Sequence, residues 1–278
     1  MANNSLREIL NKALSIKEEQ AFKQDIYYLA QRVFSYTLED LYKNIDLIVD
    51  DTVFSSYLKR YLQGEPLYYI LKEAPFYGRN FYLDNNVLIP RNETEELVYY
   101  VLSRVKKDKA FPYKILEVGS GSGCIAITLD LELENAKVYS GDISLKALEV
   151  AKKNNELLKA NVEFFQSDCL QEALRREDKY HIFVSNPPYI DKEAFVEESV
   201  LKYEPHLALF AEEKGLAVYR KILKDLDKVL YPSSFAIFEI SPEQVEGLTK
   251  IVKEYLPNYK ITFIKDINQF TRFLVLEN

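Results

Sequence analysis

The first 75 residues carry apolar side chains at helical spacing and contain few turn signals. The segment SLREILNKAL places its leucine and isoleucine side chains along one stripe, and Ser5 stands where an N-cap is expected. The same pattern recurs in AFKQDIYYLAQRVF and VFSSYLKRYL, and TLEDLYKNIDLIV predicts a further helix. We therefore predict a small helical bundle over residues 1–75, with the apolar stripes as its core.

A different pattern follows this helical segment. GEPLYYIL and APFYGRNFYLDNNVLIPRNE together contain three prolines, two glycines and aromatic residues at alternating positions. Such alternation indicates β-structure, and we predict a hairpin around Tyr77 to Leu88 that turns at the Asp-Asn-Asn sequence beginning at Asp84. We expect residues 76–88 to form a linking β-hairpin and residues 89–278 to form a second domain.

From Lys114 onward, short apolar segments alternate with helical ones such as SLKALEVAKKNNELLK. This alternation predicts an α/β fold with a mainly parallel, Rossmann-like sheet. The last two strand candidates are separated only by DINQFT, which is too short for a helical crossover, so the last strand should run antiparallel. The seven strand candidates are KILEV, KVYSGD, VEFFQ, HIFVS, SFAIFEI, ITFIK and RFLVL.

The composition excludes several classes of protein. Hydrophobic residues make up 47% of the 278 and charged residues 28%, which is ordinary for a globular protein. A net charge of −7 argues against binding nucleic acid through its phosphates. No apolar run approaches a membrane span of about 20 residues, and the N-terminus lacks the layout of a secretory signal. Two cysteines and two histidines form neither a disulfide framework nor a metal cluster, so we expect a cytoplasmic protein without a metal.

A glycine-rich loop follows the first strand candidate. ILEVGSGSGCIAITL is a short apolar strand, a Gly-x-Gly-x-Gly loop and a helix. Gly119, Gly121 and Gly123 allow positive φ and let a ligand lie against bare backbone at the helix N-terminus. The dinucleotide fingerprint requires Gly or Ala at position 124, where Cys124 stands. The loop therefore predicts a ligand site without specifying a pyrophosphate.

Three carboxylates are expected at the same edge of the sheet as this loop. Asp142 ends the second strand, where a carboxylate can accept hydrogen bonds from both hydroxyls of a ribose. Glu117, near the tip of the first strand, would repel a pyrophosphate but can face the ammonium group of an amino acid. Asp168 ends the third strand and can accept from an adenine amino group, with Cys169 near the ring. A ligand with a ribose, cationic groups and no phosphate is S-adenosylmethionine, which we favour over a nicotinamide cofactor.

The sequence SNPPYI follows the fourth strand and therefore borders the same crevice. Pro187 and Pro188 have fixed φ and no N–H group, so their carbonyl groups are held in a rigid frame. Asn186 offers a side-chain carbonyl, and Tyr189 offers a flat ring. These four residues can accept both hydrogens of a planar NH₂ group while the ring packs against its plane. The alternative without chemistry is a stiff turn that ends a strand.

Such a clamp suits methyl transfer to a weakly nucleophilic nitrogen. The lone pair of an amide or an exocyclic amine is delocalised, and two aligned acceptors stabilise the positive charge that the nitrogen develops during attack. No strong base is required, because the nitrogen becomes acidic only once methylated. Much of the rate would come from holding the nitrogen in line with the sulfonium methyl group. The motif alone does not choose between a nucleic-acid base and a glutamine.

Several stretches resemble one family of methyltransferases. NPPY with a Gly-x-Gly-x-Gly loop is similar to the amino-methyltransferases that act on adenine, guanine or glutamine nitrogens. The resemblance to the HemK-type peptide chain release factor glutamine methyltransferases runs from about Gly64 to the C-terminus. It implies methylation of the glutamine in the Gly-Gly-Gln motif of bacterial class 1 release factors, with S-adenosylmethionine as the donor. The segments that follow this family in order and spacing are GEPLYYI, FYGRNFYLDNNVLIPRNETEELV, VSNPPYI, YEPHLALFAEEKGLAVYRKIL and FEISPEQ.

The resemblance also implies roles for domains and residues. The helical domain, residues 1–75, would bind the release factor, and residues 89–278 would form the methyltransferase domain. The implied cofactor-binding residues are Gly119, Ser120, Gly121, Ser122, Gly123, Asp142, Cys169 and Asn186, and Glu117, Ile143 and Asp168 complete the predicted cofactor site. The implied substrate-binding residues are Phe76, Arg91, Glu93, Thr94, Asn186, Pro187, Pro188 and Tyr189, and the last four are also the implied catalytic residues.

Three positions differ from the pattern of this family. Asn92 replaces the proline of Arg-Pro-Glu-Thr-Glu, Cys169 stands where an aromatic residue is common, and Ser241 stands where glycine is frequent. All three lie outside the NPPY motif. We therefore expect local differences in loop geometry and adenine packing, with activity retained.

Two other functions stay open from the sequence. A nucleic-acid methyltransferase would use the same clamp on adenine or guanine, but the acidic balance and the charge-balanced helical domain disfavour it. A cofactor-binding adaptor without catalysis is disfavoured by the intact NPPY motif. Cys124 and His206 are expected to be packing residues rather than reactive groups, and nothing in the sequence requires more than a monomer.

Overall fold

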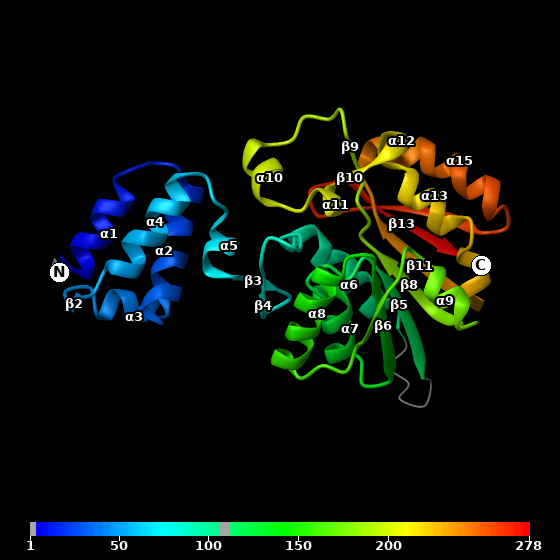
Figure 1. Cartoon of the computed structure of the whole chain (residues 1–278), viewed down its shortest axis with the longest axis horizontal. Coiled ribbons are helices and arrows are strands. Elements are labelled where there is room, and N and C mark those ends of the chain that lie inside the picture. The colour runs from blue at the N-terminus through cyan, green and yellow to red at the C-terminus, as the bar shows by residue number, and fades with distance from the viewer. Residues whose placement is uncertain (1–3, 106–111) are drawn as a thin grey trace. The chain divides into compact units, whose positions relative to one another are not determined.

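The computed structural model describes residues 4–105 and 112–278, and the chain forms two compact units, Met1–Glu73 and Ala74–Asn278 (Figure 1). Each unit has its own hydrophobic core. The division lies close to the boundary expected after residue 75. The segment expected as a linker, residues 76–88, is part of the second unit.

The first unit is a bundle of helices, as predicted. Ser5 caps the first helix: its Oγ accepts a hydrogen bond from Glu8 N at 3.3 Å, and the Glu8 carboxylate accepts from Ser5 N at 2.8 Å. These bonds satisfy N–H groups that the start of a helix leaves unpaired. The apolar stripes meet in one core, in which Leu6, Ile26 and Leu29 are fully buried. The helices are α1 (Leu6–Leu14), α2 (Gln20–Phe34), α3 (Leu38–Lys43), α4 (Thr52–Leu62) and α5 (Leu67–Leu71).

One predicted helix is shorter than its apolar pattern suggested. TLEDLYKNIDLIV forms α3 only as far as Lys43, and β2 (Ile48–Val49) pairs antiparallel with β1 (Asn4–Ser5). The Asn44 side chain donates a hydrogen bond to Asp40 O at 2.9 Å. The prediction of one helix across this segment was wrong, because a short polar side chain here occupies the backbone carbonyl at the helix end.

The β-hairpin lies earlier in the chain than predicted. β3 (Glu73–Phe76) pairs with β4 (Arg79–Tyr82), so Tyr77 and Gly78 form the turn. Both have positive φ, 49° and 74°, which suits the favoured two-residue hairpin turn. The segment at Asp84 instead forms a loop, in which Asp84 Oδ1 accepts the N–H two residues later at 2.9 Å. The predicted position of the hairpin turn was wrong, because Asx turns and hairpin turns use the same residue types.

Seven strands form one sheet in the second unit, which confirms the seven strand candidates. Their order is β12-β13-β11-β8-β5-β6-β7. β13 runs antiparallel to both neighbours, as the short DINQFT connection predicted, and the other neighbours pair in parallel. The strands are β5 (Tyr113–Val118), β6 (Ala136–Asp142), β7 (Glu163–Gln166), β8 (Tyr180–Ser185), β11 (Leu230–Glu239), β12 (Lys260–Lys265) and β13 (Thr271–Glu277).

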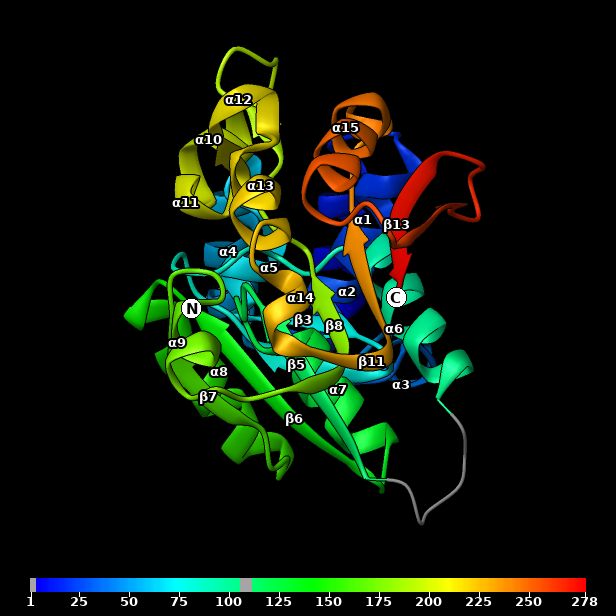
Figure 2. The same ribbon diagram turned by 90° about the vertical axis from the view of Figure 1, so that its right-hand side faces the viewer.

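Helices cover both faces of this sheet (Figure 2). Side chains on alternate strand positions separate into two cores; Ile115 and Ile182 pack on one side, and Leu116 and Phe183 on the other. The first face is covered by α6 (Asn92–Arg104), α7 (Cys124–Glu132) and α8 (Leu145–Leu158). The second is covered by α9 (Gln171–Arg175), α13 (Ala217–Leu223), α14 (Leu226–Val229) and α15 (Val245–Tyr255).

The strand order reverses at β5, which lies between β8 and β6. Open α/β sheets bind ligands at such a switch point, at the carboxyl ends of the strands. The segments that follow β8 and β11 at this edge contain short elements. They are β9 (Ile190–Asp191), α10 (Glu198–Tyr203), α11 (His206–Leu209), β10 (Phe210–Ala211), α12 (Glu212–Gly215) and the 3₁₀-helix η1 (Pro242–Gln244).

Cys124 is a buried residue that also lines the cavity described below, and His206 is exposed, so only the first packs in a core as expected. Cys124 lies in the core between α7 and the sheet, and burial raises the pKa of its thiol to about 12. The His206 ring contacts Phe210, and its Nε2 lies 2.8 Å from Leu201 O. Among the residues described, no helix is long and apolar enough to cross a membrane.

Candidate active site

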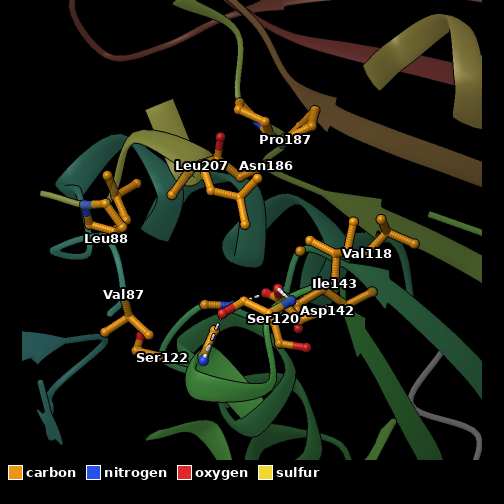
Figure 3. Close-up of a pocket in the computed structure, with 18 of the residues that line it drawn as sticks. Val87, Leu88, Val118, Ser120, Ser122, Asp142, Ile143, Asn186, Pro187 and Leu207 are labelled. Carbon is orange, nitrogen blue, oxygen red and sulfur yellow. Dashed lines mark hydrogen bonds between the residues drawn. The ribbon is translucent and has the colours of Figure 1, made fainter. Parts of the chain in front are cut away.

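A cavity of about 320 Å³ opens at the carboxyl ends of β5, β6, β7 and β8 (Figure 3). Figure 3 shows Asn186 and Pro187 on one side of it and Ser120 and Asp142 on the other. The structure therefore brings the glycine loop and the NPPY motif to one space. The predicted site residues that line it are Arg91, Thr94, Glu117, Gly119, Ser120, Gly121, Ser122, Asp142, Ile143, Asp168, Cys169, Asn186, Pro187 and Pro188.

Four predicted site residues do not line this cavity. Phe76 is 1% exposed and packs edge-to-face against Phe81, because its position on β3 points it into the core instead of the entrance. Tyr189 is half-buried against the core beneath α13. Glu93 lies in the first turn of α6, and Gly123 is the N-cap of α7.

The backbone of the glycine loop lies close to two other segments, the end of β6 and the NPPY motif. Gly119 has φ 90°, and its N–H donates to Gly141 O at 2.8 Å. A Cβ at Gly119 would lie 3.7 Å from the backbone oxygen of Asn186, so the loop and the NPPY motif approach each other here. Gly123 has φ 81°, and a Cβ there would lie 2.9 Å from Ile127 Cδ1. Glycine at these positions lets the loop turn sharply and pack on the helix that follows.

Glu117 is a buried carboxyl group at the floor of the cavity, only 1% exposed. Ser140 Oγ donates to Glu117 Oε2 at 2.5 Å, and Ser120 Oγ lies 2.6 Å from Ser140 Oγ. Burial is the main cause that raises the pKa of Glu117 to about 8. A cation at this position would offset the cost of charging the buried carboxyl group.

Asp142 is held by backbone N–H groups at the end of β6. Its Oδ2 accepts from Gly121 N at 3.0 Å, and its Oδ1 accepts from Ser144 N at 2.8 Å. Burial raises the pKa of this carboxyl group above its usual range. A carboxylate has about four acceptor positions, so these bonds leave capacity to accept from a ligand hydroxyl.

Asp168 and Cys169 lie at the end of the cavity formed by β7. Asp168 forms an ion pair with Lys221 of α13. Cys169 has φ 52°, and its carbonyl accepts from Ser167 Oγ at 2.7 Å. Burial raises the pKa of its thiol to about 12, so the sulfur presents a neutral surface to the cavity.

The NPPY motif is fixed at both ends by residues far away in the sequence. Ser185 Oγ donates to Val118 O at 2.7 Å. Gln244 Nε2 donates to Gly215 O at 2.9 Å and lies 3.4 Å from Tyr189 O. A Cβ at Gly215 would lie 2.0 Å from Tyr189 O, so only glycine permits this approach. The backbone of the motif is therefore constrained by two other loops.

The side chain of Asn186 is also held in place. Its Nδ2 donates to Thr94 Oγ1 at 3.3 Å, and Thr94 Oγ1 donates to Glu239 Oε2 at 2.7 Å. Thr94 and Glu239 are both buried. Arg91 forms an ion pair with the buried Glu204 at 2.6 Å, which ties the cavity rim to the segment before α11.

Several residues that shape this site were not found from the sequence. Asn154 is fully buried on α8; its side chain accepts from Tyr82 N at 2.7 Å and donates to Tyr82 O and Ser122 O, both at 2.9 Å. It joins the hairpin to the glycine loop. The sequence feature that could have identified Asn154 is a polar residue on the buried face of a predicted helix. Apolar residues that line the cavity but were not among the predicted site residues include Val87, Leu88, Ile125, Leu207 and Val218.

Comparison with known proteins agrees with the class that the fold and cavity indicate. The methyltransferase small domain family matches residues 99–206. A methyltransferase from Pyrococcus furiosus shares the fold at 18% identity, with a TM-score of 0.53 over 81% of this chain and 98% of that one. An rRNA methyltransferase from Thermus thermophilus, solved with AdoMet and guanosine, matches with a TM-score of 0.53 at 15% identity, over 74% of this chain and 49% of that one. The seven-stranded sheet and the cavity at its switch point define a Rossmann-like methyltransferase.

Curated relatives narrow this class. The release factor glutamine methyltransferase of Staphylococcus aureus is 36% identical over 96% of this chain and 97% of its own length. The enzyme of that name from Lactococcus lactis is 43% identical over 75% of this chain and 76% of its own length. The one from Flavobacterium psychrophilum is 35% identical over 95% of this chain and 94% of its own length. The chain belongs to the release factor glutamine methyltransferase family.

Proposed function

We propose that this chain transfers a methyl group from S-adenosylmethionine to the side-chain amide nitrogen of the glutamine in the Gly-Gly-Gln motif of class 1 release factors. The observation that supports it most is the close approach of the glycine loop to the NPPY motif, 3.7 Å between a Cβ position at Gly119 and Asn186 O. A donor against the loop and an amide against the motif would therefore be adjacent. The names of the relatives supply the substrate.

The cavity residues fit S-adenosylmethionine. Asp142, whose carboxylate keeps acceptor capacity beside its bonds to Gly121 N and Ser144 N, would bind the ribose hydroxyls. Glu117 would face the ammonium group, and the neutral surface of Cys169 would contact the adenine. Asp168 is already paired with Lys221, so its predicted bond to the adenine amino group would be shared with this cation. The bound cofactor supplies an electrophilic methyl group on a sulfonium ion.

The NPPY residues would bind and orient the glutamine amide. Asn186 Oδ1 would accept one N–H, because Nδ2 is already bonded to Thr94. A carbonyl of the Pro187–Pro188 frame would accept the other. Tyr189 does not line the cavity and packs against the core, so it would support this frame instead of stacking on the amide. Two acceptors on the nitrogen stabilise the positive charge that it develops. No described residue needs to remove a proton before methyl transfer.

Other parts of the chain would bind the protein substrate. Arg91, at the cavity rim, would contact the segment around the glutamine, and the helical unit would bind the body of the release factor. Thr94 is buried and Glu93 does not line the cavity, so we do not propose a substrate contact for either. Asn92, Cys169 and Ser241 lie outside the amide-binding motif, so their departures from the family pattern would leave this chemistry intact. We propose a monomer that acts in the cytoplasm and does not bind nucleic acid directly.

One labelling experiment tests this function. The protein is incubated with S-adenosylmethionine carrying a labelled methyl group and, in separate reactions, a class 1 release factor, bulk RNA and DNA. We expect label on the release factor alone, and none after its Gly-Gly-Gln glutamine is changed to alanine. Label on nucleic acid only would show that the amide clamp serves a base.

A further inference from the structure

The amide of Asn186 contacts a buried chain of two polar residues. Glu239 ends β11 and is 2% exposed; Thr94 lies in the first turn of α6 and is 3% exposed. Thr94 Oγ1 lies 2.7 Å from Glu239 Oε2 and 3.3 Å from Asn186 Nδ2. Three elements that are distant in the sequence therefore meet in one hydrogen-bonded line.

The number of protons available to Glu239 and Thr94 fixes the direction of the hydrogen bonds that join them to Asn186. A carboxylate only accepts, so the single proton of the Thr94 hydroxyl points to Glu239. The Thr94 oxygen can then only accept from its other neighbour. The group of Asn186 that faces it must be the NH₂, which leaves Asn186 Oδ1 on the other side.

We infer that Thr94 and Glu239 are positioning residues that hold the Asn186 amide in the one orientation able to accept a hydrogen bond from the substrate amide. The inference rests on the proposed function. The two orientations of an amide have nearly the same shape, so packing alone does not select one. In the flipped orientation the Asn186 NH₂ would face the substrate NH₂, and two donors would oppose each other.

The charge on the Glu239 carboxyl group decides whether it can hold Asn186 in this orientation, and several neighbouring groups affect that charge. Arg272 of β13 and Arg91 favour the ionised form, whereas Glu93 disfavours it. The hydroxyls of Tyr189 and Tyr219 also face this group, and Tyr219 donates to Glu239 O at 2.6 Å. Burial is the largest effect and raises the pKa of Glu239 to about 7.

A pH dependence follows from the sign of this shift. Below about pH 7 Glu239 is protonated and can donate to Thr94 Oγ1. The Thr94 proton is then free to point toward Asn186, and the preference for one amide orientation is lost. The turnover number at saturating S-adenosylmethionine should therefore fall as the pH decreases through 7.

Substitutions at Thr94 test the inference by their effect on turnover. Thr94→Val removes the hydroxyl at constant volume and should lower kcat by about tenfold or more, the loss of roughly one hydrogen bond. Affinity for S-adenosylmethionine and KM for the release factor should change little. Thr94→Ser keeps the hydroxyl and should recover most of the rate. Thr249→Val on α15, where the hydroxyl donates to Val245 O at 2.7 Å, is the control and should leave kcat unchanged.

Two further variants separate positioning from support of the fold. A carboxylate accepts in either orientation, so in an Asn186→Asp background Thr94→Val should cost little. The same loss in both backgrounds would overturn the inference. Glu239→Gln does not titrate, and its amide can either accept from Thr94 or donate to it. The acid limb near pH 7 should therefore disappear, and a limb that persists unchanged would also overturn the inference. If the wild-type protein does not methylate the release factor, the proposed function fails instead.

Discussion

The buried carboxyl groups of the site are the residues on which pH will act. Glu117 is 1% exposed, and its pKa is raised to about 8 mainly by burial. A ligand ammonium group stabilises only the ionised form, so binding must release the proton from Glu117 wherever the free carboxyl is protonated. The affinity of the site and the charge of one residue are therefore linked.

We expect affinity for S-adenosylmethionine to rise by up to about tenfold per pH unit between pH 6 and about 7.5. The rise should stop near pH 8, where the α-amine of the ligand begins to lose its own proton. Calorimetric titrations in buffers of different ionisation enthalpy measure both the affinity and the proton release. Glu117→Gln should bind more weakly and with a flatter pH dependence; a slope equal to that of the wild type would assign the proton elsewhere.

The amide-binding motif depends on loops that come from other elements. Gly215 and Gln244 contact the backbone of Tyr189, although neither lines the cavity. Ser241, where the family often has glycine, has an ordinary φ of −86°, and its N–H donates to Gln244 Oε1 at 3.0 Å. Glycine would offer the same N–H group, so this departure from the family pattern leaves the contact with Gln244 intact.

Gly215→Ala should displace the NPPY backbone, because the new Cβ would lie 2.0 Å from Tyr189 O. Displacement of a reacting group by about 1 Å can lower turnover by about a hundredfold. Binding of S-adenosylmethionine should persist, because Gly215 does not line the cavity. Gly78→Ala is a matched control: it also has positive φ, 74°, but a Cβ there meets no atom within 4 Å. Equal turnover in the two variants would show that backbone strain, and not contact with Tyr189, causes any loss.

The elements with strong local patterns could be predicted from the sequence, and those set by distant contacts could not. The strands of the sheet are short, largely apolar segments, so all seven were visible, and DINQFT was too short for any crossover. The hairpin was misplaced because positive φ at Tyr77 has no signature in its side chain. Phe76 was placed at the entrance by resemblance, whereas its strand position points it into the core. The bond between Thr94 and Glu239 spans 145 positions, and no spacing rule reports such a contact.

At the scale of the whole molecule, two units with separate cores divide the work that we propose. The core of the first unit consists of helix residues between Leu6 and Leu67, and the cavity is lined only by residues from Asn85 onward. We therefore expect cofactor binding to need the second unit alone. Binding of the protein substrate is the role that we propose for the first.

A chain that begins at Ala74 should bind S-adenosylmethionine with nearly unchanged affinity. It should methylate a release factor far more slowly, chiefly through a higher KM, because the surface for the partner is missing. Circular dichroism verifies folding, and calorimetry and steady-state kinetics measure the two properties. Full activity of this shortened chain would show that the helical unit does not bind the substrate.

The approach of Gly119 to the NPPY backbone has a consequence for inhibitor design. Glycine leaves no side chain between the glycine loop and Asn186, so the subsites that we propose for the adenosine and the amide would form one continuous space. A single compound that joins an adenosine to a carboxamide through a short linker can occupy both. Such a bisubstrate compound would distinguish this enzyme from methyltransferases that accept a flat base, since its amide end would carry the recognition of glutamine.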